Sequence, residues 1–186
     1  MKRNFPFYKQ PDTKDCGPTC LKIIAKYYGE LIPLKQIREL TETTREGSNL
    51  FKLSDAAEKI GFKSLALKTN YEKLKKAPLP LIVHWNKSHF VVVYKIMDDL
   101  IHVSDPAFGL ISFQKDEFLI RWIGNNANET TYEGIALVLE VTPKFKSHKW
   151  EKADKRSFLF LYKYLFKYKG LVFQLCLGLL VGSILQ

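Results

Sequence analysis

The sequence predicts an α+β fold, because segments with helical periodicity come first and short β-rich runs come later. The early segments carry apolar residues on one face, and two of them are followed by a glycine that ends a helix. The later runs are rich in valine, isoleucine and aromatic residues and are separated by turn residues. We therefore expect N-terminal helices packed on an antiparallel sheet.

The individual elements follow from the same patterns. The first helix is expected at residues 17–28, where Leu21, Ile24 and Tyr28 share a face and Gly29 ends the helix. Further helices are expected at 34–40 and 50–60. The rest of the pattern predicts a strand at 62–67, a helical turn at 71–75, strands at 80–85, 89–96 and 100–104, a helix at 114–122 and a closing strand at 135–141.

Composition excludes several classes of protein. The 186 residues are 46% hydrophobic, which is too apolar for a disordered chain. Three cysteines, an odd number, argue against a disulfide-stabilised secreted domain. Neither a P-loop nor a G-x-G-x-x-G motif occurs, so no nucleotide-phosphate loop is expected in this chain. Two prolines and several polar residues at positions 5–14 are unlike a signal peptide.

The composition changes near residue 143. Residues 144–169 hold nine basic and two acidic residues, whereas 170–186 hold no charge. This order is typical of the cytoplasmic flank of a membrane helix, although a C-terminal amphipathic helix docked on the domain is the alternative. The globular part carries little net charge, so nucleic acid is not an expected partner. We expect a domain at 1–142, a basic linker at 143–156, an interfacial amphipathic helix at 157–169 and the start of a first transmembrane helix at 170–186.

Cys16 is the first candidate for chemistry, since it lies immediately before the first expected helix. Gly17 and Pro18 open the first turn, where proline is tolerated. The partial positive charge of a helix N-terminus favours the thiolate, the nucleophilic form of a cysteine. A buried structural cysteine is the alternative. Cys20, one turn later, is expected in the core, and a disulfide to Cys16 would be strained.

Three further residues complete a candidate thiol-protease site. His89, one of four histidines, begins an apolar run and is a candidate base, although a histidine at a strand start also suits a structural role. Asp105 ends a strand and is placed to orient the imidazole, although Asp-Pro is also an ordinary turn. The amide of Gln10, six residues before Cys16, suits an oxyanion donor, although it also suits a plain loop.

A zinc site is the alternative to this set. Cys16, Cys20, His84 and His89 could be drawn as a Cys₂His₂ zinc site. However, C-x₃-C on a helix, with the first histidine 64 residues later, is not a usual zinc-finger spacing. No metal is therefore expected.

The combined motifs resemble the bacteriocin-processing cysteine peptidases (peptidase family 39, clan CA), the N-terminal domains of peptidase-containing ABC transporters. The resemblance covers residues 7 to about 142, with a polar stretch at 125–133 as a departure. It rests on Gln10 to Leu21, Tyr27-Tyr28-Gly29, Pro80 to Trp85, His89 to Val93, Asp105-Pro106-Ala107 and Trp122-Ile123-Gly124.

The resemblance implies a papain-like cysteine peptidase fold and an endopeptidase that cleaves leader peptides after Gly-Gly or Gly-Ala. It implies Cys16 as nucleophile, His89 as base, Asp105 as orienter and Gln10 as oxyanion donor. His84 and Trp85 are candidate walls of a narrow glycine cleft, although Trp85 equally suits the core. A second, apolar surface is expected to hold the leader.

The same resemblance implies the partners and the location. It implies transmembrane and ATPase domains outside this chain, where ATP and magnesium would bind, a homodimer in the full-length form, and a plasma-membrane location with the peptidase on the cytoplasmic side. A non-cleaving leader-docking domain and a membrane-tethered interaction domain unrelated to proteolysis are the alternatives. The presence of Cys16 argues against the non-cleaving domain.

Overall fold

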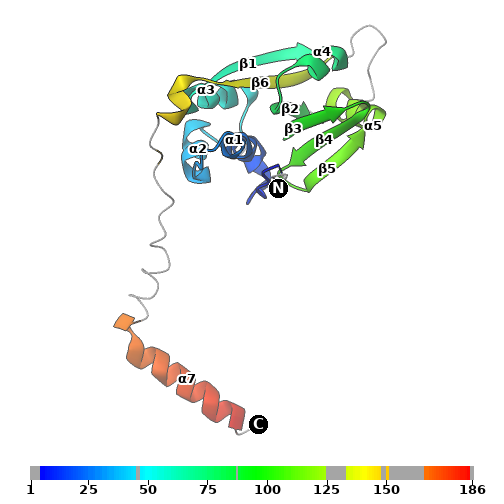
Figure 1. Ribbon diagram of the computed structural model, residues 1–186. Helices are drawn as coiled ribbons and strands as arrows, with labels where there is room; N and C mark the ends of the chain where they lie inside the picture. The colour runs from blue at the N-terminus through cyan, green and yellow to red at the C-terminus, as the bar shows by residue number, and fades with distance from the viewer. Residues whose placement is uncertain are drawn as a thin grey trace. The chain divides into compact units, whose positions relative to one another are not determined.

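The computed structural model describes residues 5–44, 47–86, 88–124, 133–147, 150 and 166–184. It divides into two compact units, residues 1–150 and 151–186, which are treated separately (Figure 1). In the described residues, the first unit contains the sheet and the helices that pack on it, and the second contains a helix at its C-terminal end.

A six-stranded antiparallel sheet organises the first unit. The strand order is β1-β6-β2-β3-β4-β5, so the last strand of the chain lies between the first two. The expected α+β class is therefore confirmed. The strands are β1 (Phe62–Thr69), β2 (Leu81–Trp85), β3 (His89–Met97), β4 (Leu100–Asp105), β5 (Gly109–Gln114) and β6 (Gly134–Val141).

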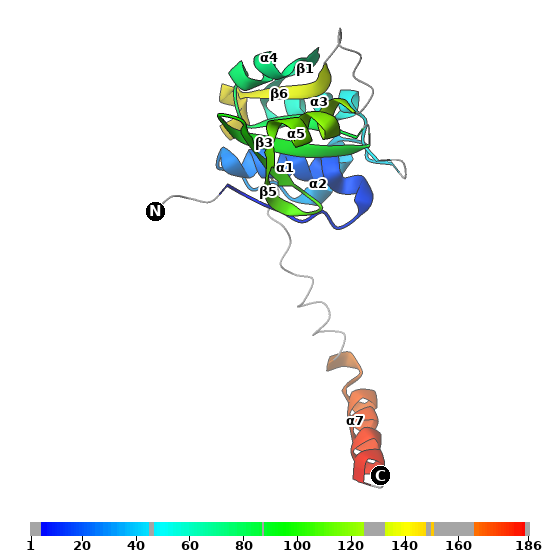
Figure 2. The ribbon, with the colours of Figure 1, turned by 90° about the vertical axis from the view of Figure 1, so that its right-hand side faces the viewer.

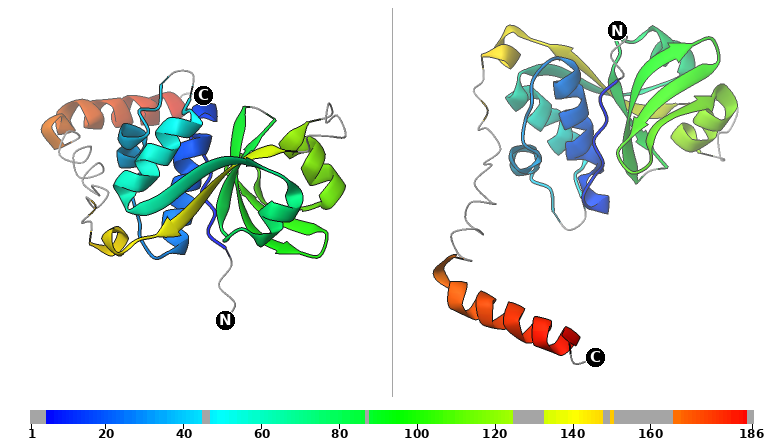
Figure 3. Two further views of the ribbon diagram at one scale, coloured as in Figure 1. Left: turned by 90° about the horizontal axis from the view of Figure 1, so that it is seen from above. Right: turned by 60° about the horizontal axis from the view of Figure 1, so that its bottom comes forward.

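Helices cover both faces of this sheet (Figures 2 and 3). One hydrophobic core joins three helices to Phe90 and Val92 of β3, and a second core joins the other helices to Val91 and Val93. The alternation arises because successive strand residues point to opposite faces. The first core holds α1 (Cys16–Tyr27), α2 (Leu34–Leu40) and α3 (Leu50–Ile60), and the second holds α4 (Tyr71–Lys76) and α5 (Lys115–Ile123).

Most predicted elements agree with the structure to within one or two residues, but β5 was missed. Its residues follow the Asp105–Gly109 turn and pair with β4 from Leu100↔Gln114 to Asp105↔Gly109. Only Phe113 of this edge strand is buried, so its hydrophobic pattern is weak. Two 3₁₀ helices, η1 (Thr13–Asp15) and η2 (Pro143–Lys146), were not expected either.

The compact unit extends beyond residue 142, where the globular domain was expected to end. Phe145 of η2 is fully buried against Phe62 and Tyr28, and Trp150 packs on the same core. Phe145, at the start of the expected linker, therefore belongs to the core. The polar stretch at 125–133 lies, except for Glu133, outside the described residues.

The second unit contributes α7 (Lys169–Ile184). It is uncharged after Lys169, and every side chain described from Phe166 to Ser183 is exposed within the unit. No helix in the described parts of the chain combines the length and apolarity needed to cross a membrane. Most of the expected interfacial helix at 157–169 lies outside the described residues.

Gly61 provides a test of how the C-terminal residues of the first unit are held. It ends α3 with φ +106°, and a Cβ there would lie 2.6 Å from both N and Cα of Phe145. Gly29 has a similar φ of +103°, but nothing lies within 4 Å of a Cβ built on it. Gly29→Ala is expected to cost about 1–2 kcal/mol for the left-handed conformation alone. Gly61→Ala is expected to cost roughly 1–3 kcal/mol more, because backbone atoms must move.

Urea denaturation followed by circular dichroism measures both changes in the free energy of unfolding. Equal costs for the two variants would contradict the close packing of Phe145 against Gly61.

Candidate active site

Cys16 is held at the N-terminus of α1 by the packing of that helix across β3. The Cys20 thiol, one turn further along, donates a hydrogen bond to the Phe90 carbonyl oxygen at 3.2 Å. Cys20 is fully buried, as expected, and burial raises the pKa of its thiol well above the ordinary value, with Cys16 as a lesser cause. Since His89 precedes Phe90, this contact brings Cys16 next to the imidazole.

The sheet joins His89 to Asp105. His89 begins β3 and Asp105 ends β4, and the pairing of Val92 with Ser104 places the two side by side. His89 Nε2 lies 2.8 Å from Asp105 Oδ1. The backbone N–H of Ala107 donates to the same Oδ1 at 2.8 Å, so the carboxylate is fixed from two directions.

The Cys16 side chain also acts on the pKa of His89. Nε2 is occupied by Asp105, so Nδ1 is the ring nitrogen that remains for another partner. Burial by itself lowers the pKa of His89, but the hydrogen bonds and negative charges of Asp105 and Cys16 outweigh it and raise the pKa to about 9. The imidazole is therefore protonated at neutral pH, which suits a partner for a thiolate.

Gln10 reaches the same place from the N-terminal segment. Its backbone N–H donates to the Pro106 carbonyl oxygen at 2.9 Å, which attaches the segment to the turn after Asp105. Its side-chain Oε1 is buried and has no hydrogen-bond partner among the described residues. Buried amide oxygens without a partner are rare in folded proteins, so this one marks Gln10 as a residue of a binding site.

An ion pair fixes the approach to Cys16. Asp15, which is buried, binds the guanidinium of Arg38 from α2 through both carboxylate oxygens, with Nε to Oδ1 at 2.6 Å. Asp15 also accepts from the Asp12 backbone N–H at 3.1 Å, as part of a capping box on η1. The hydrogen bond to Asp15 raises the pKa of Arg38. Our sequence analysis missed this pair, although Asp-x-x-Asp before a helix is a capping signal.

Two pockets are lined by these candidate residues. One, of about 520 Å³, is lined by Cys16, His84, Gly47 and Phe90 among others. The other, of about 590 Å³, is lined by His89, Asp105, Gln10 and Trp85 among others. Thr13 and Ser88 line both, so the pockets are two halves of one cleft.

The structure separates the two residues that were expected to form the glycine cleft. His84 lines the Cys16 pocket and stacks on Phe90 with ring centroids 4.6 Å apart, and burial lowers its pKa, with His89 adding to the effect. Trp85 is buried in the other core and lines the second pocket. They diverge because neighbouring residues of β2 point to opposite faces.

Two of the four residues drawn as a possible zinc set are engaged with other partners. Cys20 is engaged with the Phe90 carbonyl, and His89 with Asp105 and Cys16. Within the described part of the chain, no group of three or more His, Cys, Asp or Glu side chains is placed to hold a metal ion.

The model of the Peptidase C39 family matches residues 4–140, which include the whole constellation. The chain belongs to this family. Among curated relatives, it is 40% identical over 121 residues to the lactococcin-G-processing and transport ATP-binding protein LagD of Lactococcus lactis, which covers 62% of this chain and 17% of LagD. It is 30% identical over 185 residues to the transport/processing ATP-binding protein ComA of Streptococcus pneumoniae, which covers 95% of this chain. The chain spans only 24% of the length of ComA.

Solved structures agree with this membership of the C39 family. A double-glycine-motif protease from an AMS/PCAT transporter, solved with its leader peptide, has a TM-score of 0.65 and 30% identity, covering 75% of this chain and 93% of its own. The peptidase domain of Streptococcus ComA has a TM-score of 0.65 and 26% identity, covering 75% of this chain and all of its own.

The raised pKa of His89 predicts the pH dependence of activity. Asp105→Asn removes a charge that raises this pKa, so the imidazolium is expected to lose its proton at a lower pH. The alkaline limb of kcat/KM is expected near pH 9 in the parent and closer to neutrality in Asp105→Asn. The protonated form of His89 also stabilises the folded state relative to the unfolded state. This contribution is fully present below about pH 6.5 and is lost as the pH rises through about 9.

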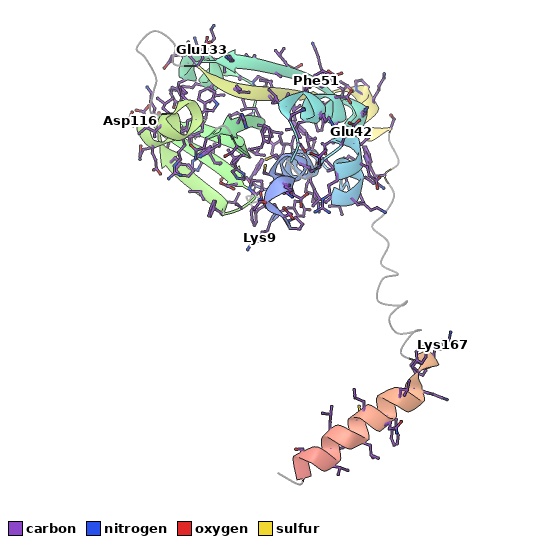
Figure 4. All side chains as sticks on the ribbon, turned by 180° about the vertical axis from the view of Figure 1, so that it is seen from behind. Lys9, Glu42, Phe51, Asp116, Glu133 and Lys167 are labelled. Atoms are coloured by element: carbon purple, nitrogen blue, oxygen red, sulfur yellow. The ribbon has the colours of Figure 1, made fainter. Side chains whose placement is uncertain are left out.

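Asp116→Asn is the matched control, because it removes the same charge at an exposed position on α5 (Figure 4). Its alkaline limb is expected to stay near pH 9. An unchanged limb in Asp105→Asn would contradict the role of the carboxylate.

Proposed function

We propose that this domain is a thiol endopeptidase that removes double-glycine leader peptides, cleaving after Gly-Gly or Gly-Ala, from peptides exported by an ABC transporter. The observation that supports it best is the 2.8 Å bond between His89 and Asp105 in a cleft whose adjoining pocket is lined by Cys16. Membership of the C39 family and the likeness to a double-glycine-motif protease support the choice of substrate.

The geometry suggests the role of each residue. The Cys16 thiolate attacks the carbonyl carbon of the last leader residue, the second residue of the Gly-Gly or Gly-Ala pair, and a C–S bond forms. The Gln10 amide and the first backbone N–H groups of α1, which have no intrahelical partner, stabilise the oxyanion. His89 donates its proton to the leaving amine as the C–N bond breaks, and Asp105 holds the imidazole. The protonless His89 then takes a proton from water, whose oxygen attacks the thioester and regenerates Cys16.

The Cys16 pocket is the proposed site of the two glycines. Its lining includes Gly47, where φ is +94°, together with Ser48 and His84. A substrate backbone without Cβ atoms approaches these groups most closely, and larger residues would clash with them. The neutral imidazole of His84, whose pKa is lowered, forms one wall without adding charge.

The leader is proposed to extend from this pocket along α3. Asn49 and Leu50 at the start of α3 line the Cys16 pocket, and the next residue, Phe51, is 80% exposed (Figure 4). An exposed aromatic side chain beside the cleft suits the apolar face of an amphipathic leader helix.

The remaining partners are proposed from the relatives. LagD and ComA are named as ATP-binding proteins, so ATP and magnesium would bind an ATPase domain outside this chain. We also propose that the full-length protein contains the transmembrane domains of the same transporter and forms a homodimer. The peptidase domain would then lie on the cytoplasmic face of the plasma membrane. A non-cleaving docking domain is not favoured, because the nucleophile and base are in contact.

Substitution of the nucleophile tests the chemistry. Cys16→Ala is expected to abolish cleavage of a synthetic amphipathic leader ending in Gly-Gly and to leave the circular dichroism spectrum unchanged. Gln10→Ala is expected to lower kcat by about 10²–10³, the usual loss for one oxyanion donor. Cys176→Ala on α7 serves as the control thiol and is expected to cleave normally. Turnover retained in Cys16→Ala would contradict the proposed nucleophile.

The C-terminal segment is proposed to contact membrane lipid, because α7 exposes apolar side chains and follows a basic stretch. A version ending at residue 150 keeps the compact first unit. We expect the 186-residue chain to float with vesicles containing anionic lipid, and the shorter version to remain in the soluble fraction and still cleave leader. Equal solubility of both without lipid or detergent would contradict membrane contact.

A further inference from the structure

We propose that the pocket of about 590 Å³ beside His89 selects cargo by binding an apolar side chain on the first residue after the cut. This inference rests on the proposed peptidase function and adds a specificity site to it. The volume lies within the range of pockets that hold ligands.

The chemistry of the cleavage decides which half of the substrate enters this pocket. The acyl half becomes bonded to Cys16, which lines only the smaller pocket. The leaving amine must lie within hydrogen-bond reach of the protonated His89, which lines only the larger pocket. Thr13 and Ser88 line both and mark where the scissile bond crosses. The first cargo residue therefore enters the larger pocket.

The lining of the pocket selects an apolar side chain. Trp85 and Phe113 form a buried aromatic floor, with ring centroids 5.2 Å apart. The Arg121 guanidinium lies 5.2 Å from the Phe113 ring centre and 5.9 Å from that of Trp85, and it is paired with Glu117 at 3.0 Å. The cation is thus already engaged by two rings and a carboxylate, so an acidic cargo residue gains little from it.

Phe108 provides the exposed side of the pocket. Its ring is 80% exposed, although its backbone is held firmly by the turn that follows Asp105. Phe108 N–H donates to the Asp105 carbonyl oxygen at 3.2 Å, and the neighbouring Ala107 N–H donates to the Asp105 carboxylate. A large exposed ring on an anchored turn is ready to cover an apolar side chain without a cost of ordering the loop.

Competing peptide substrates test this inference. Each carries the same amphipathic leader ending in Gly-Gly, and the next residue is Leu, Phe, Asn or Asp. The 186-residue chain is expected to cleave the Leu and Phe peptides with kcat/KM about tenfold higher than the Asn and Asp peptides, the scale of discrimination by an apolar pocket. Phe108→Ala is expected to reduce this ratio to about threefold or less.

Phe51→Ala is the matched control, because Phe51 is also a phenylalanine with 80% exposure but does not line this pocket. It is expected to change all four rates by the same factor and leave the ratio unchanged. Equal kcat/KM for the four peptides in the parent, or the same loss of ratio in both variants, would overturn the inference. Failure of the parent to cleave any of the four would instead overturn the proposed function.

Discussion

The active site depends on the packing of α1 across β3. The Cys20 thiol donates a hydrogen bond to the Phe90 carbonyl oxygen. Cys16 lies one turn before Cys20, and His89 lies one residue before Phe90. The same bond therefore brings Cys16 and His89 together. Neither helix nor strand holds a complete site. Because both elements are buried in the same core, the proposed nucleophile and base are fixed by the same contacts that stabilise the fold.

Asp105 links the catalytic group to the surrounding loops. Its Oδ1 accepts from both His89 and the Ala107 N–H, and the turn that it begins is also bonded to Gln10 through Pro106. One short turn therefore orients the imidazole, positions the proposed oxyanion donor and carries Phe108 to the cleft. On the other side, the buried Asp15 and Arg38 hold the segment between Gln10 and Cys16.

The sheet separates the two halves of the cleft. His84 and Trp85 are neighbours in β2, yet one lines the Cys16 pocket and the other lines the His89 pocket. The pleat of a strand makes this separation unavoidable. The same alternation places helices on both faces of the sheet. The end of a single strand, β2, can therefore line two pockets of different chemistry.

The sequence by itself determined the α+β class, most element boundaries and the candidate residues of the site. Hydrophobic periodicity predicts α1 and α3. Cys16, His89 and Asp105 can be picked out as candidates because each lies at the start or end of a predicted helix or strand. The edge strand β5 escaped prediction because only Phe113 of it is buried. Only the tertiary structure decided which side of the sheet Trp85 faces, that Asp15 pairs with Arg38, and that Phe145 belongs to the core. These outcomes depend on contacts between residues distant in the chain, which local patterns do not encode.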